Sequence, residues 1–301
     1  MKSAVVACPA KVNLFLAVTG RREDGFHDLV SLVAQTAVGD TLRATWTPES
    51  GPDTLTCDDP ALPTDETNLV LRAAQLARAR REIPGRFAFH LEKRLPSGAG
   101  LGGGSSDGVG ALRLIQRLTG ALAEADLAAL ASQLGSDCPL FLDAGPKVIR
   151  GRGEHVTRVP LRVARGLAGR RVILAQPSVA VSTPWAYGQL AARAQYTPPA
   201  RAEAEAFRLQ ERLAEDGPGV GRLRTDDWTR NDFLPVVGAK FLTIPLVIAA
   251  LNQVPGVRAG MSGSGSAVFA LIDHHVAEKE VIAVLRDAWG PHAWLVATTL
   301  R

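Results

Sequence analysis

Glycine occupies five of the seven positions from Gly98 to Gly104, and the serines Ser105 and Ser106 follow. Glycine has no Cβ, so the backbone N–H groups of such a segment can converge on an anion without steric cost. A helix that begins at the end of the segment would direct its free N–H groups and its positive dipole end at the same anion. The serine hydroxyls could cap this helix or donate to phosphate oxygens. The segment therefore indicates a phosphate-binding loop rather than a simple connector.

Two common phosphate-binding patterns match this loop only in part. The G-x-G-x-x-G run that begins at Gly98 has the letters of the dinucleotide-binding fingerprint. The acidic residues near the required distance, Glu124 and Asp126, begin a predicted helix instead of ending a strand. The run also resembles the start of a P-loop, but Gly104 stands where that motif has its lysine. A dinucleotide-dependent oxidoreductase therefore stays only as an alternative.

Two more residues are of types that could take part in group transfer. Lys11, one of six lysines, lies in an apolar stretch two residues before Asn13. An ammonium in such a place could stabilise a developing alkoxide, although a surface lysine is the simpler interpretation. Asp137 follows a predicted helix, where an aspartate often forms a turn or a cap. The residues alone leave both interpretations open.

The elements that must position these residues are mixed. Apolar alternation predicts strands over 3–8, 12–19, 38–47, 86–93, 171–175, 257–260, 267–272 and 292–299, and helical periodicity predicts helices over 68–82, 105–119, 124–134, 183–194, 236–252 and 276–289. Pro9 is expected to separate the first two strands, and residues 48–67 and 195–230 are expected to be irregular or peripheral. Because strands and helices do not alternate strictly, the sequence predicts an α+β fold in two lobes, 1–155 and 156–301.

The composition narrows the class of protein. Hydrophobic residues make up 46% of the 301 residues and charged residues 21%, which is typical of a globular chain and argues against disorder. The longest apolar run, 244–251, contains a proline and is too short to cross a bilayer, and the N-terminus makes a poor signal peptide. The three cysteines are too far apart for a disulfide framework, which favours the cytoplasm. Basic runs interleaved with aromatic residues are absent, so no nucleic-acid partner is expected.

Three separated motifs resemble those of the GHMP kinase family. They read PAKVNLFLAVTGRREDGFH at 9–27, LPSGAGLGGGSSDG at 95–108 and GMSGSGSAVFAL at 260–271. PAK-x-N-L-x-L together with R-x-D-G-[YF]-H is similar to the branch of this family that phosphorylates 4-diphosphocytidyl-2-C-methyl-D-erythritol in the non-mevalonate isoprenoid pathway. The resemblance covers nearly the whole chain. It implies the two-lobed GHMP kinase fold with the active site in the inter-lobe cleft.

The resemblance also implies roles for individual residues. The catalytic pair would be Lys11, beside the attacking hydroxyl, and Asp137, which would orient and deprotonate that hydroxyl. The ATP-binding loop would comprise Pro96, Ser97, Gly98, Ala99, Gly100, Leu101, Gly102, Gly103, Gly104, Ser105 and Ser106. The substrate-binding residues would be Asn13, Phe26, His27, Tyr187, Gly263 and Ser264. Among these, His27 would contact the cytidine and Tyr187 would stack on it, while Phe26 replaces the tyrosine that the family usually has.

The implied reaction is transfer of the γ-phosphoryl group of ATP, with Mg²⁺, to the 2-hydroxyl of the cytidyl substrate. The metal ligands are not identified by the sequence. Expected partners are the small-molecule substrate and ATP, without nucleic acid or membrane, for a cytoplasmic monomer or homodimer.

Besides the oxidoreductase, two alternatives to this reaction stay open. One is a GHMP kinase for homoserine, mevalonate or a sugar, and the other is a non-catalytic nucleotide-binding protein. The presence of both Lys11 and Asp137 argues against a loss of catalysis. Trp185 is a second candidate for stacking on the base, because it lies close to Tyr187 in the sequence.

Overall fold

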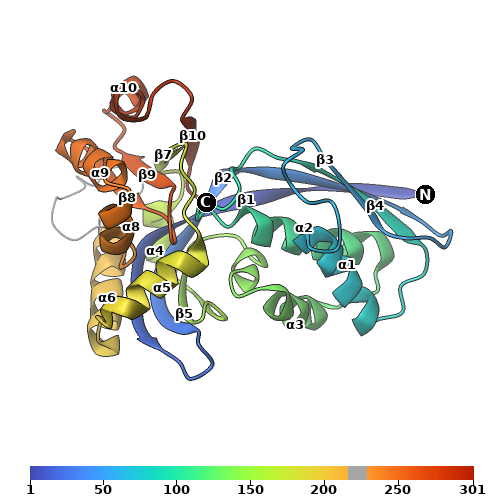
Figure 1. Cartoon of the computed structure of the whole chain (residues 1–301). Helices are drawn as coiled ribbons and strands as arrows, with labels where there is room; N and C mark the ends of the chain where they lie inside the picture. The colour runs from blue at the N-terminus through green and yellow to red at the C-terminus, as the bar shows by residue number, and fades with distance from the viewer. Residues whose placement is uncertain (216–228) are drawn as a thin grey trace. The chain divides into compact units, whose positions relative to one another are not determined.

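The computed structural model describes residues 1–215 and 229–301, and the chain divides into two compact units (Figure 1). Unit 1 comprises Met1–Ala10, Val38–Ser97 and Gly102–Ala144, and unit 2 comprises Lys11–Ala37, Gly98–Leu101 and Gly145–Arg301. The long strands β1 (Lys2–Arg21) and β2 (His27–Thr47) contribute residues to both units. The units are therefore not consecutive segments, and the division predicted between residues 155 and 156, which falls inside unit 2, stays a prediction.

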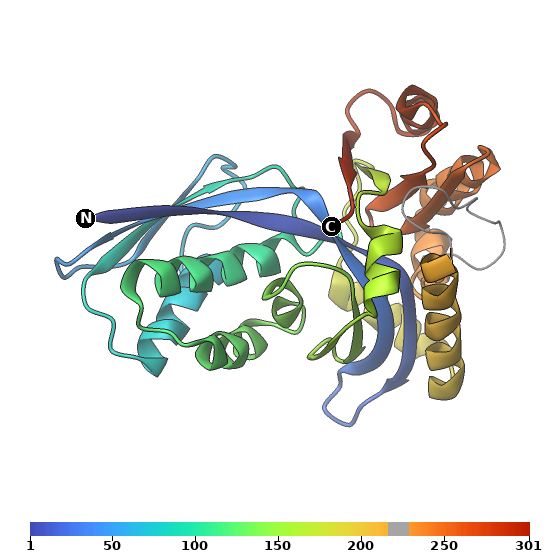
Figure 2. The ribbon, with the colours of Figure 1, turned by 180° about the vertical axis from the view of Figure 1, so that it is seen from behind.

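Unit 1 places three helices on one face of its strands (Figures 1 and 2). The last third of β2 pairs antiparallel with β4 (Arg86–Glu92), and β4 pairs in parallel with β3 (Thr54–Cys57). The helices are α1 (Leu69–Arg80), α2 (Gly103–Thr119) and α3 (Glu124–Leu134), and a short 3-10 helix, η1 (Cys138–Phe141), follows them.

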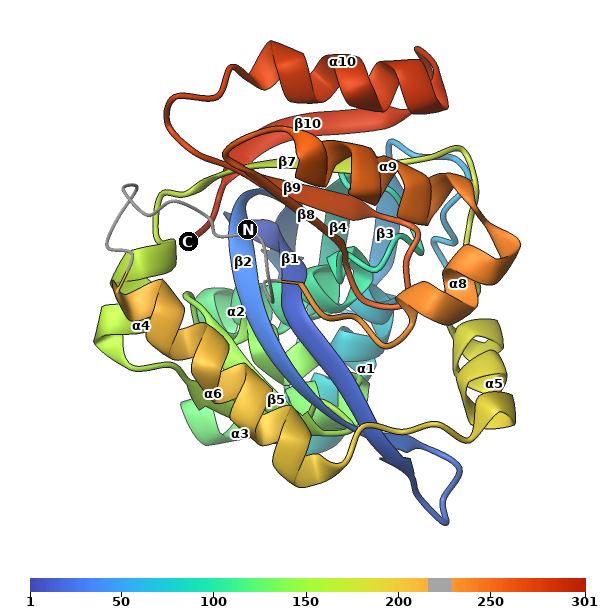
Figure 3. The ribbon, with the colours of Figure 1, turned by 90° about the vertical axis from the view of Figure 1, so that its left-hand side faces the viewer.

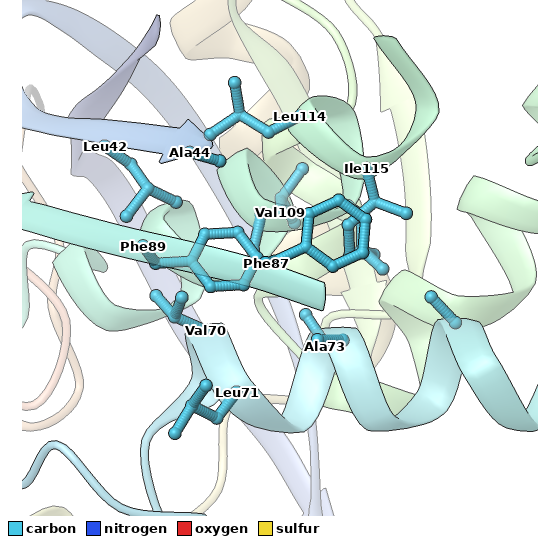
Figure 4. Packing of buried hydrophobic residues seen from close by; sticks show 14 of the residues in the cluster. Leu42, Ala44, Val70, Leu71, Ala73, Phe87, Phe89, Val109, Leu114 and Ile115 are labelled. Carbon is cyan, nitrogen blue, oxygen red and sulfur yellow. The ribbon is translucent and has the colours of Figure 1, made fainter. Parts of the chain in front are cut away.

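The core of unit 1 fixes the position of α2. Alternate residues of β4 face the helices, and among them Phe87 and Phe89 are almost fully buried against α1 and α2 (Figure 4). Val109 and Ile115 of α2 belong to the same cluster. Burial of each large apolar side chain contributes about 1.5–3 kcal/mol. The N-terminus of α2, where the glycine loop ends, is thus held by a packed hydrophobic layer.

Unit 2 contains an antiparallel sheet in the order β10 (Trp294–Thr299), β7 (Arg171–Gln176), β9 (Val268–Ile272) and β8 (Val257–Met261). The helices α9 (Thr243–Gln253) and α10 (Glu278–Trp289) pack against this sheet (Figure 3). The first part of β2 pairs with β5 (Lys147–Gly151), which pairs with β6 (His155–Arg158). The remaining helices are α4 (Leu161–Leu167), α5 (Thr183–Arg193), α6 (Pro199–Glu215) and α8 (Leu234–Lys240).

The structure confirms the α+β class and corrects several predicted elements. Pro9 does not break the first strand, because β1 buries almost every residue from Cys8 to Val18, and this burial outweighs one lost ladder hydrogen bond. The single helix predicted over 236–252 is two helices, α8 and α9, bent by 118°. Within the predicted peripheral stretch 195–230, α6 is an amphipathic helix, and residues 216–228 lie outside the described residues.

Within residues 1–215 and 229–301, no single helix is long and apolar enough to cross a membrane, and only the bent pair α8–α9 reaches that length and hydropathy when its two helices are counted together.

Candidate active site

The three sequence motifs meet in unit 2 through hydrogen bonds. Residues Gly98–Leu101, the middle of the glycine loop, lie beside β1, where the backbone N–H of Lys11 donates to the carbonyl of Leu101 at 2.9 Å. The third motif is the connection between β8 and β9. Its Ser262 donates from Oγ to the carbonyl of Gly100, also at 2.9 Å. Segments that are far apart in the sequence therefore form one local structure.

Gly100 allows this close approach. Its φ is +82°, in the left-handed region that favours glycine. A Cβ at this position would lie 2.2 Å from the carbonyl oxygen of Ser262. Any side chain would therefore push the glycine loop and the β8–β9 connection apart.

The Lys11 side chain is buried, with a relative exposure of 4%. Its Nζ donates to Asn13 Oδ1 at 2.6 Å, and Asn13 Nδ2 in turn donates to Ser31 Oγ at 2.9 Å. A Cβ built on Gly263 would lie 3.2 Å from the same Nζ, so the ammonium is adjacent to the β8–β9 connection. A buried ammonium in a fixed direction suits the stabilisation of negative charge on a reacting oxygen.

The end of the glycine loop lies in unit 1, where Gly102 precedes the first residue of α2, Gly103. Ser106 in the first turn is 2% exposed, and its Oγ has no hydrogen-bond partner among the described residues. A buried hydroxyl without a partner is costly unless a ligand satisfies it. The positive end of α2 lies at the same turn, so a phosphate oxygen fits there. The other predicted ATP residues of unit 1 are Pro96, Ser97, Gly104 and Ser105.

Asp137 also belongs to unit 1. It is half-buried and immediately precedes η1, but its side chain makes no capping hydrogen bond to that helix. Asp137 therefore does not form the helix cap that the sequence alone leaves possible. Burial raises the pKa of the neighbouring Cys138 thiol to about 12, so this thiol stays protonated and is a poor nucleophile. The catalytic role of Asp137 stays a prediction.

A cluster of aromatic rings surrounds His27 in unit 2. The ring centroid of Tyr187 lies 4.9 Å from that of His27. The ring centroid of Tyr196 lies 5.9 Å from that of His27, and its hydroxyl lies 3.5 Å from His27 Nε2. Phe233 packs edge-on against Tyr187 at 4.7 Å. Burial, helped by the charge of Arg21, lowers the pKa of His27 and favours its neutral form. A neutral imidazole can both donate and accept a hydrogen bond at the edge of a base.

The other two aromatic candidates lie apart from this cluster. Phe26 is 51% exposed, and the guanidinium of Arg152 lies 4.7 Å from its ring centroid. Trp185 packs edge-on against Phe241 at 6.0 Å, and Lys240 lies over its ring. Of the two stacking candidates near the end of the T-P segment, only Tyr187 is in ring contact with His27.

The β8–β9 connection is held by side chains of unit 2. Asn231 donates from Nδ2 to the carbonyls of Met261 at 2.7 Å and Gly263 at 2.8 Å. Ser264 is buried, and its Oγ lies 2.8 Å from Thr183 Oγ1. These bonds fix the conformation of the connection beside Lys11.

The chain is similar to known kinases along its whole length. It matches the family models "GHMP kinases N terminal domain" over residues 68–145 and "GHMP kinases C terminal" over residues 204–291. It is 38% identical over 295 residues to a 4-diphosphocytidyl-2-C-methyl-D-erythritol kinase of Synechococcus sp., covering 96% of this chain and 94% of the relative. The enzyme of the same name from Granulibacter bethesdensis is 36% identical, with 96% and 92% covered. The chain belongs to the GHMP kinase family.

Solved structures agree with this assignment. A crystal structure of 4-(cytidine 5'-diphospho)-2C-methyl-D-erythritol kinase has a TM-score of 0.75 and 33% identity, and the match covers 99% of both chains. The homoserine kinase from Cytophaga hutchinsonii has a TM-score of 0.74 at 19% identity, covering 100% and 96%, which shows a shared fold alone. The GHMP kinase fold predicted from the motifs is thus confirmed.

Sequence reasoning missed several residues that shape the site of this GHMP kinase. Tyr196 lies within the stretch judged peripheral, although it is one of only two tyrosines in the chain and both contact His27. Ser262 was part of the third motif but was given no role. Its bond to Gly100 depends on a pairing between distant segments, which no local pattern reveals.

Proposed function

We propose that this GHMP kinase transfers the γ-phosphoryl group of ATP to the 2-hydroxyl of 4-diphosphocytidyl-2-C-methyl-D-erythritol, a step in the synthesis of isoprenoid precursors. Two relatives that are named as kinases of this substrate match nearly the full length of the chain. The observation that carries the substrate choice is the contact of His27 with Tyr187 and Tyr196. Aromatic faces and a neutral imidazole suit a cytosine ring, whereas homoserine and mevalonate offer no ring to stack.

The phosphates of ATP would bind at the glycine loop. The backbone N–H groups of the loop and of the first turn of α2 would donate to the phosphate oxygens. The buried, unpartnered Ser106 Oγ fits the Mg²⁺–phosphate group and would hold it at this turn. In the described parts of the chain, no group of three or more His, Cys, Asp or Glu side chains is placed so that it could hold a metal ion. Mg²⁺ would neutralise negative charge on the phosphates. In such sites its ligands are usually phosphate oxygens and water molecules.

Two residues would act on the substrate hydroxyl. Asp137 would accept the hydroxyl proton as the oxygen attacks the γ-phosphorus, and ADP would leave with the electrons of the broken bond. Lys11, fixed by its bond to Asn13, would stabilise the negative charge that develops on the attacking oxygen. Phosphoryl transfer depends mainly on positioning and charge stabilisation, so these groups suffice for it.

A coupled assay of ADP formation tests the proposal. Purified protein with ATP and Mg²⁺ should turn over the cytidyl substrate and should turn over homoserine, mevalonate and galactose far more slowly. Turnover of one of these instead would assign the protein to another GHMP branch. Thermal stabilisation by CMP or CDP without ATP provides a second test, because a homoserine or mevalonate kinase should not show it.

The remaining sequence predictions concern the cellular location, the partners and the oligomeric state of the enzyme. A cytoplasmic location, the lack of nucleic-acid and membrane partners, and a monomeric or homodimeric state stay predictions.

A further inference from the structure

Three buried ionisable side chains form a cluster in unit 1 that the proposed chemistry does not use. Lys93 donates from Nζ to Asp40 Oδ2 at 2.5 Å and to Asp107 Oδ2 at 3.2 Å. The side chains of Lys93, Asp40 and Asp107 are 7%, 0% and 4% exposed. Buried ion pairs are often no more stabilising than apolar side chains of the same size. The cluster therefore calls for a role other than stability.

Asp40 fixes the backbone where the glycine loop begins. Its Oδ1 accepts the N–H groups of Arg94 at 2.7 Å and Leu95 at 2.9 Å. The next two residues, Pro96 and Ser97, open the loop. The carboxylate that pairs with Lys93 thus also holds the chain at the loop entrance.

The loop exit contacts the same cluster. A Cβ built on Gly103, the first residue of α2, would lie 3.3 Å from Asp40 Oδ2 and 3.4 Å from Lys93 Nζ. Asp107 follows one turn later on α2 and accepts a hydrogen bond from Lys93. The beginning of α2 is thereby attached to the ammonium of Lys93.

We propose that Lys93, Asp40 and Asp107 are positioning residues for ATP, because they hold both ends of the glycine loop in the geometry that receives the phosphates. Fixing both ends of a loop reduces the conformational entropy that is lost when the loop orders around a ligand. Lys93 acts indirectly, since its ammonium is directed at two carboxylates. This inference rests on the proposed function, which assigns ATP to the loop.

The main test compares two variants of Asp107. Asp107→Leu has nearly the same size but cannot accept the bond from Lys93. Loss of a hydrogen bond to a charged group should raise KM for ATP about tenfold and leave KM for the cytidyl substrate nearly unchanged. Asp107→Asn keeps an acceptor oxygen, so its KM for ATP should stay close to that of the wild type.

The sign of the effect separates positioning from direct binding. If Lys93 bound ATP itself, Asp107→Leu would release its ammonium and remove a negative charge, and KM for ATP would fall or stay unchanged. Either result would overturn the inference. The inference would also fail if Asp107→Leu and Asp107→Asn lowered the melting temperature equally and changed KM for ATP no more than KM for the cytidyl substrate. That pattern is expected of a purely structural role.

A second variant covers the case in which Asp107→Leu does not fold. Lys93→Met combined with Asp107→Leu and Asp40→Asn removes all three charges together, and an asparagine at position 40 can still accept the N–H groups of Arg94 and Leu95. It should show the same rise in KM for ATP, and an unchanged KM would contradict the proposal.

Hydrogen exchange tests loop positioning without nucleotide. Amides of residues 97–104 should exchange faster in Asp107→Leu than in Asp107→Asn, because the loop exit is no longer held. Equal exchange would overturn this inference. A wild-type protein that does not bind ATP would instead overturn the proposed function, so the two failures are distinguishable.

Discussion

Asp137 is half-buried, and its side chain makes no capping hydrogen bond to the helix that follows it. Asp137→Asn should bind both ligands and lose about 10²–10⁴-fold in kcat, because an amide cannot take up the hydroxyl proton. KM should change little, as is typical when a transition-state interaction is removed. Steady-state kinetics check this, with the exposed Asp143→Asn as a control for the same change in the same unit. Turnover within a few-fold of wild type would remove Asp137 from the proposed mechanism.

Tyr187 and Trp185 offer a matched comparison, because both lie on α5 but only Tyr187 contacts His27. Tyr187→Ala should weaken the cytidyl substrate by about 5- to 150-fold, since base–aromatic stacking contributes about 1–3 kcal/mol. ATP affinity should be unaffected. Trp185→Ala should change neither affinity. Isothermal titration with CDP and with ATP measures both, and a larger CDP loss in the tryptophan variant would move the stacking role to Trp185.

At the scale of elements, the glycine loop contains its own control. Gly98 and Gly100 both have positive φ, but nothing lies within 4 Å of a Cβ on Gly98, whereas one on Gly100 would clash with Ser262. Gly98→Ala should therefore carry only the left-handed penalty, about 1–2 kcal/mol. Gly100→Ala should lower the melting temperature further and weaken ATP more. Equal effects on the melting temperature and on ATP affinity would contradict the packing of the loop against the β8–β9 connection.

The elements that could be predicted are those with a strong local pattern. α2, α3, β4 and the strands of the unit 2 sheet lie within a few residues of their predicted bounds. The short strands β3, β5 and β6 were missed, because four or five residues give little periodicity. α6 was missed because its buried face is partly alanine, as at Ala202 and Ala206, in a strongly polar segment.

The residues of the candidate site also fall into two groups, those that a local sequence pattern reveals and those that it does not. The motifs of Lys11, His27 and the glycine loop could be located because their letters are contiguous. The partners that hold them could not, since Lys93 and Asp40 are 53 residues apart and meet only after β2 and β4 pair. Tyr196 likewise reaches His27 across 169 residues.

At the scale of the whole molecule, two aspartates of unit 1 give the free energy of unfolding opposite dependences on pH. Burial, with the negative charge of Asp40, raises the pKa of Asp107 to about 7 against the opposing charge of Lys93. Hydrogen bonds from Arg80, the Ala123 backbone and Arg81 lower the pKa of Asp126 to about 2.

Between about pH 4, where an unfolded aspartate titrates, and about pH 7, the folded state keeps the Asp107 proton while the unfolded state releases it. The Asp107 contribution to stability is therefore complete below pH 4 and is lost as the pH rises through 7, with a slope of at most about 1.4 kcal/mol per pH unit for one proton. Asp107→Asn removes this dependence. Urea unfolding from pH 4 to pH 8 should show the variant gaining stability relative to wild type up to about pH 7 and then levelling. Asp126→Asn should differ in the opposite sense, because it lacks a contribution that wild type has above about pH 4 and loses towards pH 2. Extending the same urea series down to pH 2 measures this difference. Parallel curves for Asp107→Asn and wild type would contradict the raised pKa of Asp107.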